Sequence, residues 1–203
     1  RSTYAKSDEG TSIYADALCA DGSSMVTEFI YWSDYYNSII SPFYSYSTGR
    51  TKETLRSSQV TCRDIDDDGY IEIPEDTSSK KQSSEITSQN WVNYGNTVLS
   101  HKCYSFSCKR DGYILVIDDD DFSKVKANYD SESRKLTIIN KKNKSNVFEI
   151  VTLINSNYSV NDPKYKDYTM IMKNSGFVYL AKVNKSSDID INIQTLKDMI
   201  KVY

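Results

Sequence analysis

The sequence is poor in the residues that mark several large classes of protein. It has one histidine, His101, and no CxxC pair of cysteines, which disfavours a structural zinc site. It has no glycine-rich loop of the kind that cradles phosphate groups. No apolar run approaches the length of a membrane span, and seven glycines and three prolines are too few for a fibrous or low-complexity chain.

An excess of positive charge is also missing. The formal net charge is −3, so the chain lacks the basic surface that non-specific nucleic-acid binding requires. The first residues, RSTYAKSDEG, include no initiator methionine. We therefore expect a processed fragment whose targeting signal or membrane anchor lay upstream.

Cysteines are few, and their pairing is left open. Cys19, Cys62, Cys103 and Cys108 allow either disulfides or free thiols. Cys103 and Cys108 lie in a strand-like run, where full extension would separate them by roughly 17 Å. That distance is beyond the reach of a disulfide, so a bridge between these two would need a turn.

Aromatic residues are abundant, with 17 Tyr, 6 Phe and 2 Trp, and they supply the apolar area that a core needs. Residues 1–76 are expected to form a small antiparallel β segment. TSIYADALCA and MVTEFIYW read as strands around the turn signal ADGSS, with LRSSQVTCRDI as a third strand and YIEIP as a fourth. SDYYNSII is expected to form a short helical turn capped by Ser33. Residues 77–90 are polar and serine-rich, and are predicted to be a linker.

Residues 91–203 are expected to form a second domain. VLSHKCYSFSC with YILVI, KVKANYD with RKLTIIN, and YTMIM with FVYLAKV predict three hairpins, and NVFEIVTLI a buried strand. Ile193, Leu196, Met199 and Ile200 fall on one face of a C-terminal helix. The predicted fold class is α+β, mainly antiparallel β: an N-terminal β segment, then an antiparallel sheet covered by a C-terminal helix.

The most specific motif is DIDDDGYIEIPE, from Asp64 to Glu75. Carboxylates at positions one, three and five, then a glycine, have the spacing of a calcium loop. The predicted ligands are the side chains of Asp64, Asp66, Asp68 and Glu72 and the carbonyl of Tyr70, with Glu75 left open. Hard oxygen ligands in a flexible arrangement suit calcium better than magnesium. Pro74 disfavours the exit helix of an EF-hand, so we expect strand, loop and strand. The alternative is a solvated acidic turn without an ion.

This part of the chain resembles a known family. CRDIDDDGYIEIPED, preceded by YADALCADGSSMVTEFIYW, is similar to the closing segment of FG-GAP/VCBS-type repeats in uncharacterised bacterial lipoproteins. Such repeats are propeller-blade units whose loops carry a D-x-D-x-D-G calcium motif. WVNY, RDGYILVI, FSKV, VFEI and VYLAKV resemble the C-terminal domain that follows them. The resemblance implies a propeller-blade-like remnant, the same calcium ligands and a cell-surface location. One loop and a few strands cannot close a propeller.

Three other groups of residues are candidate sites. The contiguous acids Asp118–Asp121 are expected to form a solvated exit from a strand, capping a short helical turn, with a second cation site as the alternative. His101 is of a residue type that can act as a general base, but it stands beside no nucleophile motif, and we expect an exposed strand position. The third group is aromatic: Trp32, Tyr35, Tyr36, Tyr44 and Tyr46. These rings are expected to pack the small sheet or its contact with the second domain; the alternative is a platform for sugar or peptide ligands.

The sequence thus predicts a non-enzymatic, extracellular, surface-anchored fragment with a structural calcium ion. Its C-terminal domain would be an accessory or ligand-binding module, with an unidentified glycan or protein as partner. Two alternatives remain. One is a carbohydrate- or peptide-binding module that uses the N-terminal aromatics, and the other is a secreted hydrolase that uses a pair of carboxylates.

Overall fold

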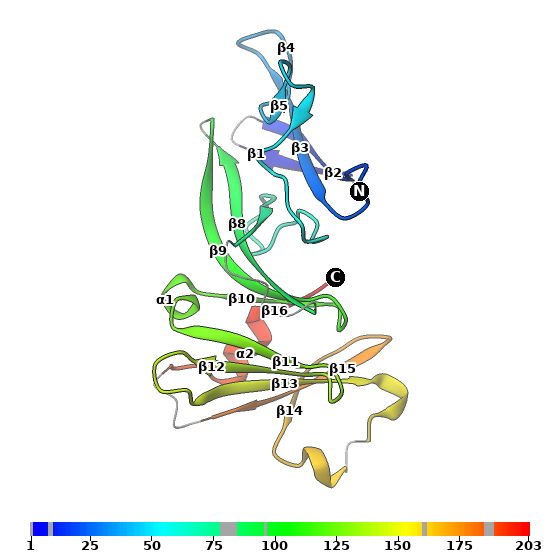
Figure 1. Ribbon diagram of the computed structural model, residues 1–203, viewed down its shortest axis with the longest axis vertical. Helices are drawn as coiled ribbons and strands as arrows, with labels where there is room; N and C mark the ends of the chain where they lie inside the picture. Colours follow the sequence, from blue (N-terminus) through cyan, green and yellow to red (C-terminus); the bar gives the residue numbers. More distant parts are fainter. Residues whose placement is uncertain (1, 8–9, 78–84, 96, 160–161, 185–188) are drawn as a thin grey trace. The chain divides into compact units, whose positions relative to one another are not determined.

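The chain is mainly antiparallel β structure, as predicted, with only short helices (Figure 1). The computed structural model describes residues 2–7, 10–77, 85–95, 97–159, 162–184 and 189–203. The chain divides into two compact units. Unit 1 comprises Arg1–Ser78 and Ser88–Tyr104, and unit 2 comprises Ser79–Thr87 and Ser105–Tyr203.

The boundaries of the units differ from the predicted domain limits of 1–76 and 91–203. Residues 91–104 group with unit 1 because Val92 and Tyr94 pack into its core. Residues 78–84, half of the predicted linker 77–90, lie outside the described residues. The last part of that segment is the start of a strand that begins at Ile86.

Unit 1 begins with a four-stranded antiparallel sheet in which consecutive strands are neighbours. Period-two alternation buries Tyr14 on the second strand and Phe29 and Tyr31 on the third. Phe29 lies at the centre of the aromatic core, with ring centroids 4.8 Å from Tyr14 and 5.0 Å from Tyr94. The strands are β1 (Ser2–Ser7), β2 (Gly10–Leu18), β3 (Met25–Ser33) and β4 (Ser38–Ile40).

SDYYNSII does not form a helix, although Ser33 caps the turn as predicted by accepting a hydrogen bond of 3.3 Å from the Tyr36 amide. The chain makes a tight turn over residues 34–37 and returns as β4, which pairs with β3 through Trp32 and Ile39. Asn37 has a φ of 45°, and this left-handed conformation, which asparagine tolerates better than most residues, allows the chain to reverse there.

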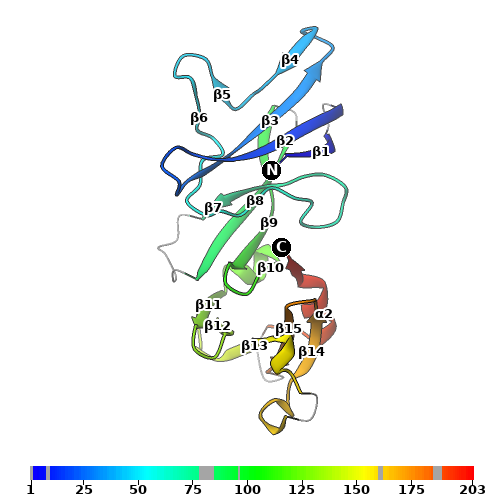
Figure 2. The ribbon, with the colours of Figure 1, turned by 90° about the vertical axis from the view of Figure 1, so that its right-hand side faces the viewer.

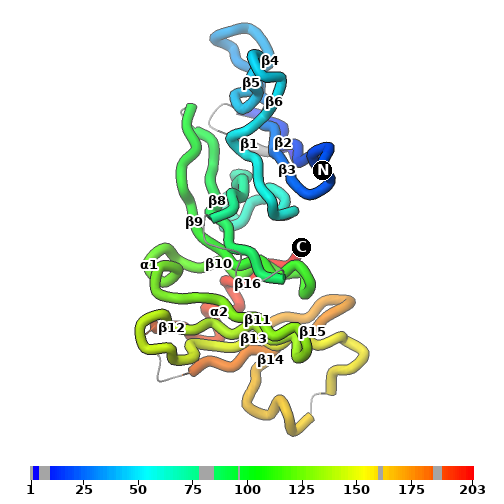
Figure 3. Tube along the Cα trace, viewed as in Figure 1, coloured from blue at the N-terminus to red at the C-terminus, as the bar shows by residue number. Residues whose placement is uncertain are grey.

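The rest of unit 1 is a short hairpin, a long irregular segment and a second strand pairing. The hairpin joins β5 (Tyr44–Ser45) to β6 (Arg50–Thr51), and β7 (Ile73–Asp76) pairs antiparallel with β8 (Ile86–Gly95). Strand β9 (Val98–Cys108) follows, and like β8 it has residues in both units. The irregular segment, residues 52–72, is the cyan to blue-green stretch that follows β6 in Figure 3.

The strand predicted at LRSSQVTCRDI, residues 55–65, is also wrong. Two isolated bridges, Met25 with Arg56 and Arg63 with Glu72, replace a continuous ladder. Side-chain carboxylates take the backbone donors instead: Asp76 accepts hydrogen bonds from the amides of Ser57 and Ser58 at 2.6 and 3.0 Å. Carboxylates distant in the sequence therefore fix this segment.

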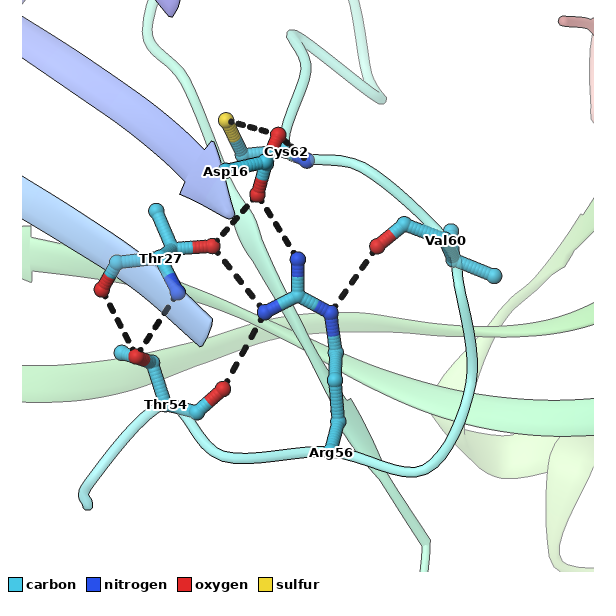
Figure 4. A network of polar contacts seen from close by, with 6 residues as sticks. All are labelled: Asp16, Thr27, Thr54, Arg56, Val60 and Cys62. Atoms are coloured by element: carbon cyan, nitrogen blue, oxygen red, sulfur yellow. Dashed lines mark hydrogen bonds and ion pairs between the residues drawn. The ribbon is translucent and has the colours of Figure 1, made fainter. Parts of the chain in front are cut away.

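A buried ion pair fastens the irregular segment to the β2–β3 hairpin (Figure 4). Asp16 and Thr27 are direct partners across the two strands and both face the core. Nη2 of Arg56 lies 2.7 Å from Oδ1 of Asp16, and the two side chains are 0% and 1% exposed. Further members of this network are the hydroxyls of Thr27 and Thr54, the Thr54 and Val60 carbonyls, and the Cys62 amide and thiol.

Unit 2 contains the second and third predicted hairpins, the last part of the first, and the predicted buried strand. The end of β9 neighbours β10 (Tyr113–Ile117), and a five-stranded sheet has the order β11-β12-β13-β15-β14 (Figure 2). Its strands are β11 (Val125–Asp130), β12 (Lys135–Asn140), β13 (Asn146–Ile154), β14 (Thr169–Lys173) and β15 (Phe177–Val183). Short helices connect the strands: α1 (Asp119–Phe122), η1 (Asn155–Asn157) and η2 (Pro163–Tyr165).

The predicted C-terminal helix is present but shorter than expected. Helix α2 (Ile193–Met199) contacts β14 and β15 and buries Leu196, and Asn192 caps it by accepting hydrogen bonds from the Gln194 and Thr195 amides. Ile200 belongs to strand β16 (Ile200–Val202), which pairs with β10. The β-branched residues at 200 and 202 favour the strand.

Candidate metal site

The acidic motif forms a loop whose two ends are hydrogen-bonded to each other. Arg63 and Glu72 exchange backbone hydrogen bonds of 3.1 and 2.9 Å, and β7 begins directly afterwards at Ile73. Asp67 and Gly69 have φ values of 63° and 89°. These left-handed residues reverse the chain between the ends, and glycine is the residue that does so without strain.

Asp64 holds the turn from inside. Its two carboxylate oxygens accept hydrogen bonds from the amides of Asp68 and Gly69, at 3.0 and 2.9 Å. Asp68 likewise accepts a bond from the Tyr70 amide at 2.9 Å. A carboxylate oxygen can accept more than one hydrogen bond, so these bonds orient the carboxylates without exhausting them.

Glu72 is the unusual member of the loop because it is fully buried. Its Oε2 accepts a hydrogen bond from the Ile65 amide at 3.0 Å, whereas Oε1 has no hydrogen-bond partner among the described residues. Burial, together with the nearby charges of Asp66 and Asp68, raises the pKa of Glu72 to about 7. A buried carboxylate oxygen without a partner is energetically costly unless a cation or a proton compensates it.

The loop brings three of the predicted ligands together. Asp64, Asp66 and Glu72 each offer an oxygen, and these atoms lie within 4.8 Å of one another. The set contains only carboxylate oxygens, which suits a hard cation such as calcium and not zinc. These three residues could therefore hold a hard divalent cation, and calcium stays a prediction.

The other predicted ligands lie differently. Asp68 is not in the group of three, and its Oδ2 is 2.6 Å from Nζ of Lys102. Glu75 lies on β7, where its carboxylate accepts a hydrogen bond of 2.9 Å from Asn90 on β8. The Tyr70 side chain is exposed, and only its backbone carbonyl was predicted to bind.

Lys102 on β9 is the residue that sequence reasoning missed. It also lies 3.3 Å from Oδ2 of Asp66. The hydrogen bond that it donates to Asp68 lowers the pKa of that carboxyl and raises the pKa of the lysine. No signal in the sequence connects position 102 with the loop, because strand pairing alone brings them together.

The second acidic cluster forms the predicted short helical turn, α1, rather than a second group of ligands. The amide of Phe122 bonds the carbonyl of Asp118, and Asp121 pairs with Lys124 at 3.0 Å. Within the part of the chain that the structure describes, Asp118–Asp121 belong to no group of three or more side chains placed to hold a metal ion.

His101 is exposed on β9, as expected, and its ring contacts Asn90 and Tyr104. None of the four cysteines, all of which lie in the described residues, forms a disulfide, and Cys62 and Cys108 are buried. Among the described residues, neither His101 nor the cysteines form a cluster of possible ligands. The candidate metal site is therefore the carboxylate loop.

The aromatic cluster predicted to pack the sheet does not do so. Tyr35 is 88% exposed, Tyr46 84%, Tyr36 66%, Trp32 52% and Tyr44 39%. They lie at the β3–β4 and β5–β6 turns, and two pairs make edge-to-face contacts, Tyr35 with Tyr36 and Tyr44 with Tyr46. Strand alternation separates Trp32 from the core, because Tyr31 and Trp32 are adjacent in β3 and point to opposite faces.

None of the described helices has the length and apolarity needed to cross a membrane. No protein-family model, no curated protein and no solved structure matches this chain.

Proposed function

We propose that the chain is a non-enzymatic module of a cell-surface protein, in which a structural calcium ion fastens unit 1. Asp64, Asp66 and Glu72 would hold the ion, with the Tyr70 carbonyl as a further ligand implied by the resemblance. The observation that carries the proposal is the unpartnered, fully buried Oε1 of Glu72 beside two other carboxylates. A bound divalent cation would balance these charges, and its binding free energy would appear as stability of the fold.

The sheet topology supports the finer parts of this proposal. A four-stranded antiparallel sheet with consecutive strands as neighbours is the arrangement of a propeller blade. In the proposal, unit 1 is a blade-like remnant of an FG-GAP/VCBS-type lipoprotein. Unit 2, whose sheet contacts helix α2, is an α+β accessory module. An extracellular location agrees with a calcium site because calcium is abundant outside cells.

The decisive comparison is between two glutamates that stand three positions apart. With saturating calcium the wild-type protein is expected to melt at a higher temperature than with a chelator, by roughly 10 °C for a ligand present at about 100 times its Kd. Glu72→Gln is expected to abolish this increase, since it removes a charged ligand but keeps the shape. Glu75→Gln is expected to retain it, because Glu75 bonds Asn90 instead. Differential scanning calorimetry measures all three proteins.

A wild-type midpoint that does not respond to calcium, with no heat of binding in titration calorimetry, would contradict the proposed site. Loss of the response in Glu75→Gln but not in Glu72→Gln would move the site elsewhere on the loop.

A second candidate function rests on the exposed rings at the two hairpin turns. A Tyr or Trp side chain carries roughly 150–250 Å², and exposed apolar area on that scale marks interaction sites. From Trp32 to Thr51 only Asp34 and Arg50 are charged, and seven residues are Ser or Thr. Rings and hydroxyls without charge suit a neutral saccharide, whose C–H faces stack on aromatics while its hydroxyls form hydrogen bonds.

Polysaccharide pull-down and titration with neutral oligosaccharides test the saccharide function. Tyr35→Ala and Tyr46→Ala are each expected to weaken binding about tenfold, because each removes a stacking surface. Tyr4→Ala is the matched control, since Tyr4 is 74% exposed on β1 and outside the two turns. Equal losses in all three variants, or no binding by the wild type, would reject this function.

A further inference from the structure

Lys102 brings a positive charge into the acidic loop from another strand. Its Nζ lies 2.6 Å from Asp68 and 3.3 Å from Asp66, and 27% of the lysine side chain is exposed. Among the described residues, Lys102 is the cation that forms ion pairs with Asp66 and Asp68. The ammonium group therefore supplies part of the positive charge that the loop requires.

Asp66 belongs to two groupings at once. It offers an oxygen to the three-carboxylate group with Asp64 and Glu72, and it also pairs with Lys102. A divalent ion in the first grouping would lie next to the ammonium group in the second, and like charges at such separations repel strongly in a partly buried site. The single negative charge of Asp66 cannot fully stabilise both the metal ion and the ammonium group of Lys102.

We propose that Lys102 is a built-in competitor for the metal, which neutralises Asp66 and Asp68 in the metal-free protein and lowers the affinity of the loop for calcium. This inference rests on the calcium site proposed above. It makes the loop responsive to the calcium concentration, because the metal-free state has its own cation and does not collapse through repulsion between carboxylates. In the bound state Lys102 gives up its contact with Asp66.

A purely structural ion pair predicts something different. A half-exposed lysine–aspartate pair contributes little to stability, and its removal would leave calcium affinity unchanged. Competition instead predicts two effects of opposite sign from one substitution. Removal of the ammonium group strengthens calcium binding and destabilises the metal-free protein, since Asp66 and Asp68 then lack their counter-charge.

The test compares Lys102→Met with Lys102→Arg and the wild type. Titration calorimetry with calcium chloride at low ionic strength gives the affinity, and melting in chelator gives the stability of the metal-free protein. Lys102→Met is expected to bind calcium about tenfold more tightly and to melt at a lower temperature in chelator. Lys102→Arg, which keeps the charge, is expected to stay close to the wild type. Lys124→Met is the matched control, because Lys124 pairs with Asp121 in unit 2.

The outcomes separate this inference from the site on which it rests. If the wild type binds calcium, Glu72→Gln does not, and Lys102→Met binds with unchanged or weaker affinity, the calcium site stands and the competition is overturned. If neither the wild type nor Lys102→Met binds calcium, both proposals are overturned.

Discussion

Replacement of Asp16 with alanine is expected to destabilise unit 1 by about 3–5 kcal/mol. The substitution leaves the guanidinium group of Arg56, whose side chain is 0% exposed, without its counter-charge. It also removes the acceptor of the Cys62 amide and of the Thr27 hydroxyl. A buried charge without a partner costs far more than the loss of an ion pair at the surface.

Urea denaturation followed by tryptophan fluorescence measures this loss. Both tryptophans, Trp32 and Trp91, belong to unit 1, and Trp91 is fully buried, so their emission reports this unit alone. The double variant Asp16→Ala/Arg56→Met is expected to be more stable than Asp16→Ala, because it no longer buries an unpaired charge. Additive losses in the double variant, or a loss below about 1 kcal/mol in Asp16→Ala, would contradict this account of the network.

Unit 2 also has a buried aspartate paired with an arginine, Asp111. Its replacement with alanine is expected to lower the free energy of unfolding by about 2–4 kcal/mol. Asp111 is fully buried between β9 and β10. Its carboxylate lies 2.6 Å from Nη2 of Arg134 and accepts a hydrogen bond of 2.8 Å from the Tyr129 hydroxyl. The expected loss is smaller than for Asp16 because 18% of the Arg134 side chain reaches solvent, which can hydrate the orphaned guanidinium group.

Amide hydrogen exchange of β11–β13 measures the change in unit 2. Protection of these strands is expected to fall in Asp111→Ala, whereas tryptophan emission should report an unchanged unit 1. Asp167→Ala is the control, because Asp167 and Lys182 form an exposed pair at 3.4 Å, which is worth at most about 1 kcal/mol. Equal loss of protection in both variants would contradict the expectation that the buried Asp111 pair contributes more to stability than the exposed Asp167 pair.

The hairpins of unit 2 could be predicted because their information is local. Alternating apolar residues flank turn sequences at each one, and the observed registers follow, as in the pairing of β11 with β12. The helix ended early for a reason that is not local: Ile200 pairs with Leu115, 85 positions earlier by their residue numbers. Local periodicity cannot distinguish a last helical turn from a strand that finds such a partner.

The wrong predictions in unit 1 have the same cause, because partners distant in the sequence decide the structure there. Residues 55–65 read as a strand because their apolar positions alternate, but Asp16 and Asp76 accept their backbone donors. YIEIP is predicted to be a strand of alternating apolar and acidic residues, yet Ile71, Glu72 and Ile73 are all buried. The spacing of aspartates nevertheless brought Asp64, Asp66 and Glu72 into the candidate site, since a twelve-residue loop is itself a local structure.

The division of β8 and β9 between the units has a consequence for how this chain can be shortened. Each unit is built from two separate stretches, and the chain passes from one to the other more than once. A fragment that stops at Ser78 would leave Phe29 and Ile73 without Val92 and Tyr94, which belong to the same core. Neither half can therefore be excised with a single cut, and exchange of such modules between genes would have to carry both together.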